Sequence, residues 1–265
     1  MKAREEKTER KKTLNQVLFI IGALLGWELM AWTGWFPPLL FPKMSQVLIH
    51  LWAGLSGGEL LARVAFSLYI IGLGLSLAVV TAALVTTGAM LSPLISDWVQ
   101  ALMAVLHPLP GIAILPVIIL WLGTGSRSIV AVIWFSSLWP LIANLHTGLR
   151  SVPTTQIEVG RNLGLKGSQL VRSILLPGAF PYILTGLRVG WARAWQASVA
   201  AEMVFGASGG EGGLGWFIYK KRFFLEIPSV FAGMILIILI GLLVERLCFE
   251  EVERRTVRRW GMTAE

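Results

Sequence analysis

Six apolar segments alternate with short polar segments along the chain, and this alternation dominates the sequence. A helix that crosses about 30 Å of hydrocarbon needs roughly 20 mostly apolar residues. Because each apolar segment has about that length or more, the pattern predicts six membrane-spanning helices. The expected spans cover approximately residues 14–32, 62–90, 95–122, 128–149, 178–205 and 228–249. No small-residue cleavage site follows the first apolar segment, which favours a retained span over a cleaved signal peptide.

The third expected span is interrupted by proline. His107, Pro108, Leu109, Pro110 and Gly111 stand in a row inside it. Broken backbone at membrane depth is tolerated where it lines a water-filled cavity or is covered by other protein. Pro108 and Pro110 are therefore candidates for a gate or for the lining of a translocation path, and a simple kink is the alternative.

Composition supports a membrane protein. The chain has 265 residues, of which 55% are hydrophobic and 14% are charged, whereas soluble domains have about 25% charged residues. We expect an all-α polytopic fold, with a polar tail at 1–13, a membrane domain at 14–250 and a second polar tail at 251–265. The net charge of +8 does not indicate nucleic-acid binding, because the basic residues form no single stripe. The single cysteine, Cys248, excludes an intramolecular disulfide and a cysteine metal cluster.

Lysine and arginine are unevenly divided between the two sides of the expected membrane domain. The two termini and the segments near residues 150–172 and 246 hold about fifteen of them, against about six in the alternate loops. Positive charge favours the cytoplasmic side. Both termini and the polar segment at 151–176 are therefore expected in the cytoplasm, and the Lys220-Lys221-Arg222 cluster is an exception to the rule.

The most specific motif lies in this polar segment. Its key residues are Glu158, Val159, Gly160, Gly164, Ile174, Leu176 and Pro177. The spacing resembles the EAA loop of binding-protein-dependent ABC importer permeases, in which Glu-Ala-Ala is followed by three residues, Gly, nine residues, Ile, one residue and Leu-Pro. Val159 and Gly160 replace the two alanines. The layout of the whole chain is similar to the nitrate, sulfonate and taurine branch of these type I importers, for example at Ala201-Glu202-Met203 and Gly213-Leu214-Gly215.

The resemblance implies a transport subunit rather than an enzyme. Such permeases work as homodimers in the bacterial inner membrane, with two separate ATPase subunits that bind ATP and Mg²⁺ and an external solute-binding protein. The chain itself carries no Gly-x4-Gly-Lys-Ser/Thr phosphate-binding loop, and we expect no cofactor in it. The expected ATPase-coupling residues are Glu158, Val159, Gly160, Arg161, Leu163, Gly164, Ile174 and Pro177.

Elementary helix chemistry predicts the shape of this coupling loop. A first short helix is expected to end at Gly164, since glycine adopts the left-handed conformation at low cost. A second short helix is expected at 168–173, and Pro177 is expected in the first turn of the fifth span, where no amide donor is needed. Glu158 is expected near the start of the first helix, where the dipole favours a carboxylate; a merely solvated charge is the alternative.

Charged residues inside the fifth span are further candidates. Arg193 and Glu202 lie where buried charge usually meets a partner or a water-filled path. They are nine residues apart, about 13 Å along a helix, which argues against a direct pair. A path for an anion is one interpretation, with Pro108, Pro110, Arg193, Trp195 and Glu202 as its candidate residues; structural pairing or snorkelling, as for Arg188, is the other.

Three function classes follow. The leading hypothesis is an ATP-driven importer of a small anion such as a sulfonate, taurine, nitrate or bicarbonate, with a vitamin precursor or another neutral solute as the alternative. An ion-gradient-driven transporter would need carboxylates at mid-membrane, and Glu28 and Glu202 are nearly the only ones. A membrane-embedded enzyme is disfavoured, since no metal-ligand cluster or nucleophile motif is visible.

Overall fold

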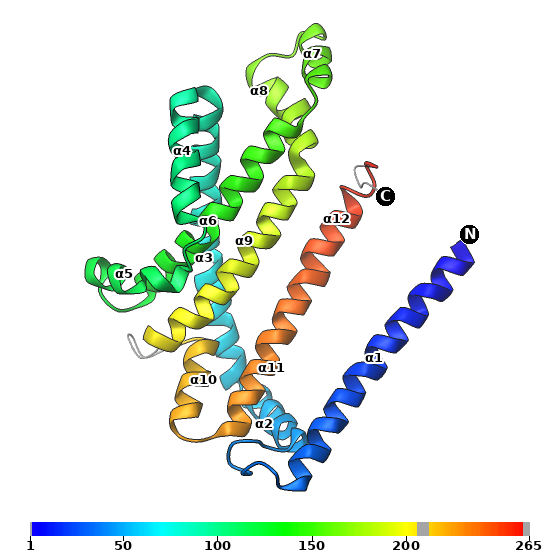
Figure 1. Cartoon of the computed structure of the whole chain (residues 1–265), viewed down its shortest axis with the longest axis vertical. Coiled ribbons are helices and arrows are strands. Elements are labelled where there is room, and N and C mark those ends of the chain that lie inside the picture. Colours follow the sequence, from blue (N-terminus) through cyan, green and yellow to red (C-terminus); the bar gives the residue numbers. More distant parts are fainter. Residues whose placement is uncertain (1, 206–211, 262–265) are drawn as a thin grey trace. The chain divides into compact units, whose positions relative to one another are not determined.

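The computed structural model describes residues 2–205 and 212–261, and in these ranges the chain is helical with short connections and without strands (Figure 1). The expected all-α fold is confirmed. The helices are α1 (Lys2–Thr33), α2 (Met44–Ser56), α3 (Glu59–Leu91), α4 (Pro93–Leu106), α5 (Leu115–Leu122), α6 (Ser126–Ser151), α7 (Thr154–Asn162), α8 (Gly167–Leu170), α9 (Leu176–Phe205), α10 (Leu214–Phe223), α11 (Ile227–Val244) and α12 (Glu251–Arg255). A 3₁₀ turn, η1 (Gly111–Ile114), and two π-helical turns, η2 (Val171–Leu175) and η3 (Glu245–Glu250), complete the described elements.

Five helical stretches in the described ranges are long and apolar enough to cross a membrane. They cover Leu14–Thr33, Glu59–Leu91, Ser126–Ser151, Gly167–Phe205 and Ile227–Arg255. The third expected span, at 95–122, is a bent pair, in which Pro93–Leu106 and Gly111–Leu122 meet at 93°. The bend lies at Pro108 and Pro110, because proline has no amide donor for the helical ladder. The predicted interruption is confirmed.

The chain divides into two compact parts, residues 1–61 with 217–236, and residues 62–216 with 237–265. In the first part, Val47 of α2 is fully buried in a small core with Met44 and Ala232. The indole of Trp27 stacks on Phe41 at 4.5 Å and donates a hydrogen bond to the carbonyl of Pro42. These contacts fix the connection between α1 and α2.

The second part is organised around the pair α6 and α9, which lie side by side along much of their length (Figure 1). Glycines allow this close approach. A Cβ atom added at Gly186 would lie 2.8 Å from Asn144 Cβ, and one added at Gly190 would lie 3.2 Å from Leu141 Cγ. Small residues are how membrane helices bring their backbones together, since lipid supplies no hydrophobic driving force. The pair therefore forms a closely packed axis through this part.

The N-terminal half of α9 also contacts the C-terminal region of the chain. Arg188 forms ion pairs with Glu245 and Glu253, each at 2.9 Å. The ring of Phe180 packs edge-on against Trp260, with ring centroids 5.5 Å apart. Arg188 is thus paired structurally, as one of the two interpretations of the sequence expects.

Candidate functional site

The polar segment forms two helical elements joined by a tight turn. Pro153 disfavours the helical conformation in the residue before it, and Val152 is indeed extended (φ −65°, ψ 122°), which ends α6. α7 then runs from Thr154 to Asn162. Gly164 is left-handed, with φ +84°. Its N–H donates to the carbonyl of Arg161 at 2.9 Å, and the next N–H, of Leu165, donates to Gly160 at 3.0 Å. This pair of bonds is a Schellman cap, and the predicted role of Gly164 is confirmed.

The predicted position of Glu158 at a helix start is wrong. Glu158 is the fifth residue of α7, and the first turn of that helix holds no acidic residue. The helix begins earlier than expected because Pro153 supplies its start and Thr154 already belongs to it. The helix dipole therefore does not explain Glu158. Its side chain is exposed, together with Val159 and Leu163, which are 57% and 76% exposed.

Gly160 and Ile174 join the two halves of the motif. Gly160 is buried, and a Cβ added there would lie 2.9 Å from Leu170 Cδ1 and 3.0 Å from Ile174 Cγ1. α7 therefore packs directly on α8 and η2 at this point. The glycine in place of the second alanine of the family pattern lets the helices approach this closely. The residues between Gly160 and Ile174 form the turn at Gly164 and the helix α8, which brings Ile174 back against Gly160.

The expectation of a separate second short helix is also wrong. Helical structure continues without a break from Gly167 to Phe205. Pro177 is the second residue of α9, in its first turn as predicted, but it directly follows the π-helical turn Val171–Leu175, in which the N–H of Leu176 donates to the carbonyl of Val171. Such a turn absorbs a residue that cannot donate to the regular ladder. The second half of the expected coupling segment is therefore the N-terminal end of the long helical stretch Gly167–Phe205 itself.

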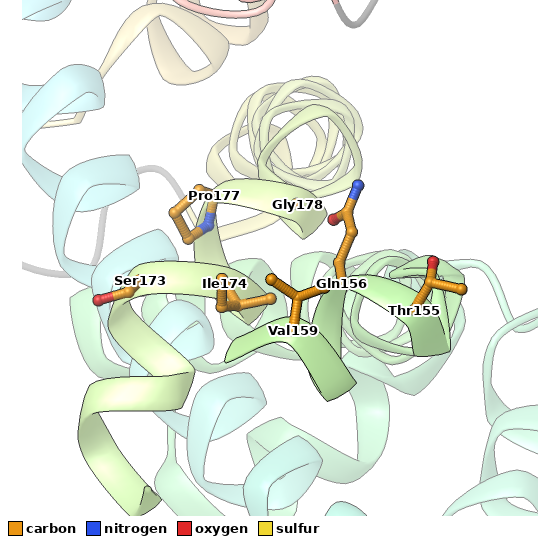
Figure 2. A pocket seen from close by; sticks show the side chains of 7 residues that line it. All are labelled: Thr155, Gln156, Val159, Ser173, Ile174, Pro177 and Gly178. Carbon is orange, nitrogen blue, oxygen red and sulfur yellow. The ribbon is translucent and has the colours of Figure 1, made fainter. Parts of the chain in front are cut away.

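A cavity of about 330 Å³ lies between these elements (Figure 2). It is lined by Thr155, Gln156 and Val159 from α7, Ser173 and Ile174 from η2, and Pro177 and Gly178 from α9. In Figure 2, Val159 and Ile174 lie next to each other. Three of the expected coupling residues, Val159, Ile174 and Pro177, thus share one concave surface.

The candidate path residues of α9 lie on opposite sides of that helix. Arg193 is exposed, whereas Trp195 is 8% exposed and Glu202 is fully buried. Nine residues correspond to two and a half turns, so Arg193 and Glu202 point in opposite directions and form no pair. Trp195 stacks on Trp191, with ring centroids 5.8 Å apart. The prolines Pro108 and Pro110 are exposed at the bend between α4 and η1.

Glu202 is enclosed by hydrogen-bond donors from three helices. Its carboxylate accepts the hydroxyls of Ser67 of α3 and Ser198 of α9, each at 2.8 Å, and the N–H of Gly215 of α10 at 2.9 Å. Ser67 Oγ accepts in turn from the N–H of Leu214 at 3.0 Å. Every described contact of this buried carboxylate is a donor, so the site satisfies a buried charge without a cation. Glu202 joins the C-terminal end of α9 to the start of α10.

Close packing around Glu202 leaves no room for a side chain at either glycine beside Leu214. A Cβ at Gly213 would collide with Ser67 Oγ and Glu202 Oε2, and one at Gly215 would collide with the carbonyl oxygen of Val199. Sequence reasoning noted Gly213-Leu214-Gly215 only as part of a family resemblance and did not identify Ser67. The paired glycines were the available signal of a close approach.

Comparison with known proteins agrees with this architecture. The family model described as "binding-protein-dependent transport system inner membrane component" matches residues 46–248. A putative ABC transporter permease protein of Methanocaldococcus jannaschii is 33% identical over 246 residues, covering 91% of this chain and 90% of the relative. The taurine transport system permease protein TauC of Escherichia coli is 31% identical over 240 residues, covering 87% and 86%. A solved inward-facing structure of the MetNI methionine ABC transporter has a TM-score of 0.60 at 18% identity and covers 75% of this chain and 96% of its own.

Proposed function

We propose that this chain, which belongs to the family of binding-protein-dependent transport system inner membrane components, imports a small anion by means of ATP hydrolysed on separate subunits. The observation that carries the proposal is the coupling segment. α7 is an exposed short helix that packs on the N-terminal end of the continuous helical stretch Gly167–Phe205. A force applied to α7 is thereby transmitted directly to a membrane-spanning helix.

The exposed side of α7 supports docking of a partner protein. Val159 and Leu163 are mostly exposed although they are large and apolar, and Glu158 and Arg161 stand beside them. A mixed apolar and charged surface on a rigid helix is suited to a protein interface. We assign this surface to the ATPase subunit. Two copies of the chain would present two such helices to two ATPase subunits, and an external binding protein would deliver the solute from the other side.

Co-purification tests the coupling role. Gly164→Val forces a β-branched residue into a left-handed conformation, which should distort the cap of α7 and prevent recovery of the ATPase subunit with the permease. Gly58→Val is the matched control, because Gly58 has φ +77° and open space around it but lies between α2 and α3. Both variants should insert in the membrane. Normal recovery of the ATPase with Gly164→Val would refute the proposed interface.

The energy source is tested separately. Uptake by membrane vesicles that contain the whole complex should require ATP inside the vesicle and persist when a protonophore collapses the proton gradient. Uptake that stops with the protonophore while ATP remains would favour an ion-gradient-driven transporter.

A substrate that carries an oxyanion group is supported by the taurine permease among the relatives, since taurine carries a sulfonate. The alternative is a neutral solute such as a vitamin precursor. The binding protein that works with this chain decides between them in a thermal-shift screen: taurine, nitrate or bicarbonate should raise its melting temperature, and a neutral heteroaromatic compound should not.

A further inference from the structure

One face of α9 is exposed along five residues, four of which are polar. Tyr182, Thr185, Val189, Arg193 and Gln196 are all exposed. Their spacing of three and four residues places them on a single side of the helix. We call these five residues the α9 stripe. The side that packs on α6 through Gly186 and Gly190 is a different one.

Arg193 lies deep within the span. At 1.5 Å per residue it is about 18 Å from the Phe205 end of α9 and about 25 Å from the Leu176 end. These distances exceed the reach of an arginine side chain, so the guanidinium cannot extend to either end of α9. A charged group at that depth faces a water-filled space or a partner rather than lipid.

Arg193 is also the one charged residue of α9 without a described partner. Arg188 is paired with Glu245 and Glu253, and Glu202 accepts its bonds on the opposite side of the helix. In residues 2–205 and 212–261, no hydrogen bond or ion pair engages the guanidinium of Arg193. Its positive charge is therefore available to a ligand.

We propose that the α9 stripe lines the water-filled translocation path and that Arg193 selects oxyanions in it, with Gln196 as a second donor one turn away. A guanidinium presents several N–H groups in a plane that matches two oxygens of a carboxylate, sulfonate or nitrate group. The hydroxyl of Thr185 is already bonded to the carbonyl of Pro181 at 2.9 Å, so Arg193 and Gln196 are the groups left to bind the anion. This inference rests on the proposed import function. It does not include Trp195 or Glu202, which face away from the stripe.

Thiol accessibility tests the stripe without requiring transport. The chain has one cysteine, so Cys248→Ser provides a cysteine-free background. Gln196→Cys is then labelled in permeabilised membranes that contain the full complex, so that a path open to either side is reached. The reagents are an anionic sulfonatoethyl and a cationic trimethylammonioethyl methanethiosulfonate. Leu84→Cys is the control, since Leu84 is a 70% exposed apolar residue in the span Glu59–Leu91.

We expect Gln196→Cys to react at least 10-fold faster than Leu84→Cys, and to react several-fold faster with the anionic reagent than with the cationic one. Arg193→Gln should abolish the preference for the anionic reagent, and Arg193→Lys should keep most of it. Labelling of Gln196→Cys as slow as that of Leu84→Cys would overturn the water-filled stripe. Fast labelling with the same charge preference in Arg193→Gln would overturn the role of Arg193. Neither readout depends on ATP, so a failure of the proposed ATP-driven import is detected separately in the vesicle uptake assay.

Discussion

Replacing Glu202 by leucine is expected to release the start of α10 from the C-terminal end of α9. The carboxylate accepts bonds from Ser67, Ser198 and Gly215. In its absence the two hydroxyls can turn to carbonyls in their own helices. The N–H of Gly215 belongs to the first turn of α10 and has no such carbonyl.

The cost follows from that one amide. A buried donor left without a partner costs about 1–3 kcal/mol. The favourable bonds to the charged carboxylate are lost too, but its own desolvation is relieved in the same step. We therefore expect the free energy of local opening at this site to fall by about 1–3 kcal/mol, which raises the equilibrium constant for opening roughly 5- to 150-fold.

Hydrogen–deuterium exchange measures this directly. The amide of Gly215 in the Glu202→Leu variant should exchange roughly 5- to 150-fold faster than in the unmodified chain, while amides in the centre of α6 should be unchanged. Ser198→Ala is the matched control, because it removes a donor and leaves the acceptor of Gly215 in place. Glu202→Gln should fall between them, since its amide oxygen can still accept from Gly215. Unchanged exchange at Gly215 in Glu202→Leu would refute the reasoning.

Three further changes have defined outcomes. Gly186→Leu should separate α6 from α9 and lower the yield of folded permease in size-exclusion chromatography, whereas Gly241→Leu, at a glycine with open space, should not. Arg188→Met removes the guanidinium from Glu245 and Glu253 and should make the C-terminal helix more sensitive to limited trypsin digestion; equal digestion of both chains would contradict this. The ammonium group of Lys221, 2.7 Å from the Glu226 carboxylate, lowers the pKa of Glu226 below its usual 4.5. This exposed pair should thus contribute up to about 1 kcal/mol above pH 4.5 and lose it as the pH falls through the lowered pKa, so the melting temperatures of Lys221→Met and the unmodified chain should converge in acid but differ at neutral pH.

Much of the architecture could be predicted because it follows from local properties of the chain. The spans follow from runs of apolar residues long enough to cross a bilayer, and the bend near Pro108 and Pro110 follows from the missing amide donors. The left-handed conformation of Gly164 was also predictable from local properties, because a glycine, which has no Cβ, commonly ends a helix in that conformation. The motif spacing led us to predict the coupling segment, and its role in coupling stays a prediction.

Two predictions about the coupling segment failed because its helices depend on their neighbours. Glu158 lies in the middle of α7, since Pro153 sets an earlier start. Residues 168–173 continue into α9, since a π-helical turn accommodates Pro177 where a break was expected.

The sequence by itself determined that α9 carries Arg188, Arg193 and Glu202, and that these residues point in different directions around a helix. Only the tertiary structure decided what each direction meets. Glu202 is enclosed because Ser67, 135 residues earlier in the chain, packs against it, and Arg188 is neutralised by glutamates of the C-terminal helix. Arg193 is left exposed because glycines turn the neighbouring face of α9 toward α6. Helical periodicity fixes the angles between side chains, but contacts between segments distant in the sequence determine which of them are buried.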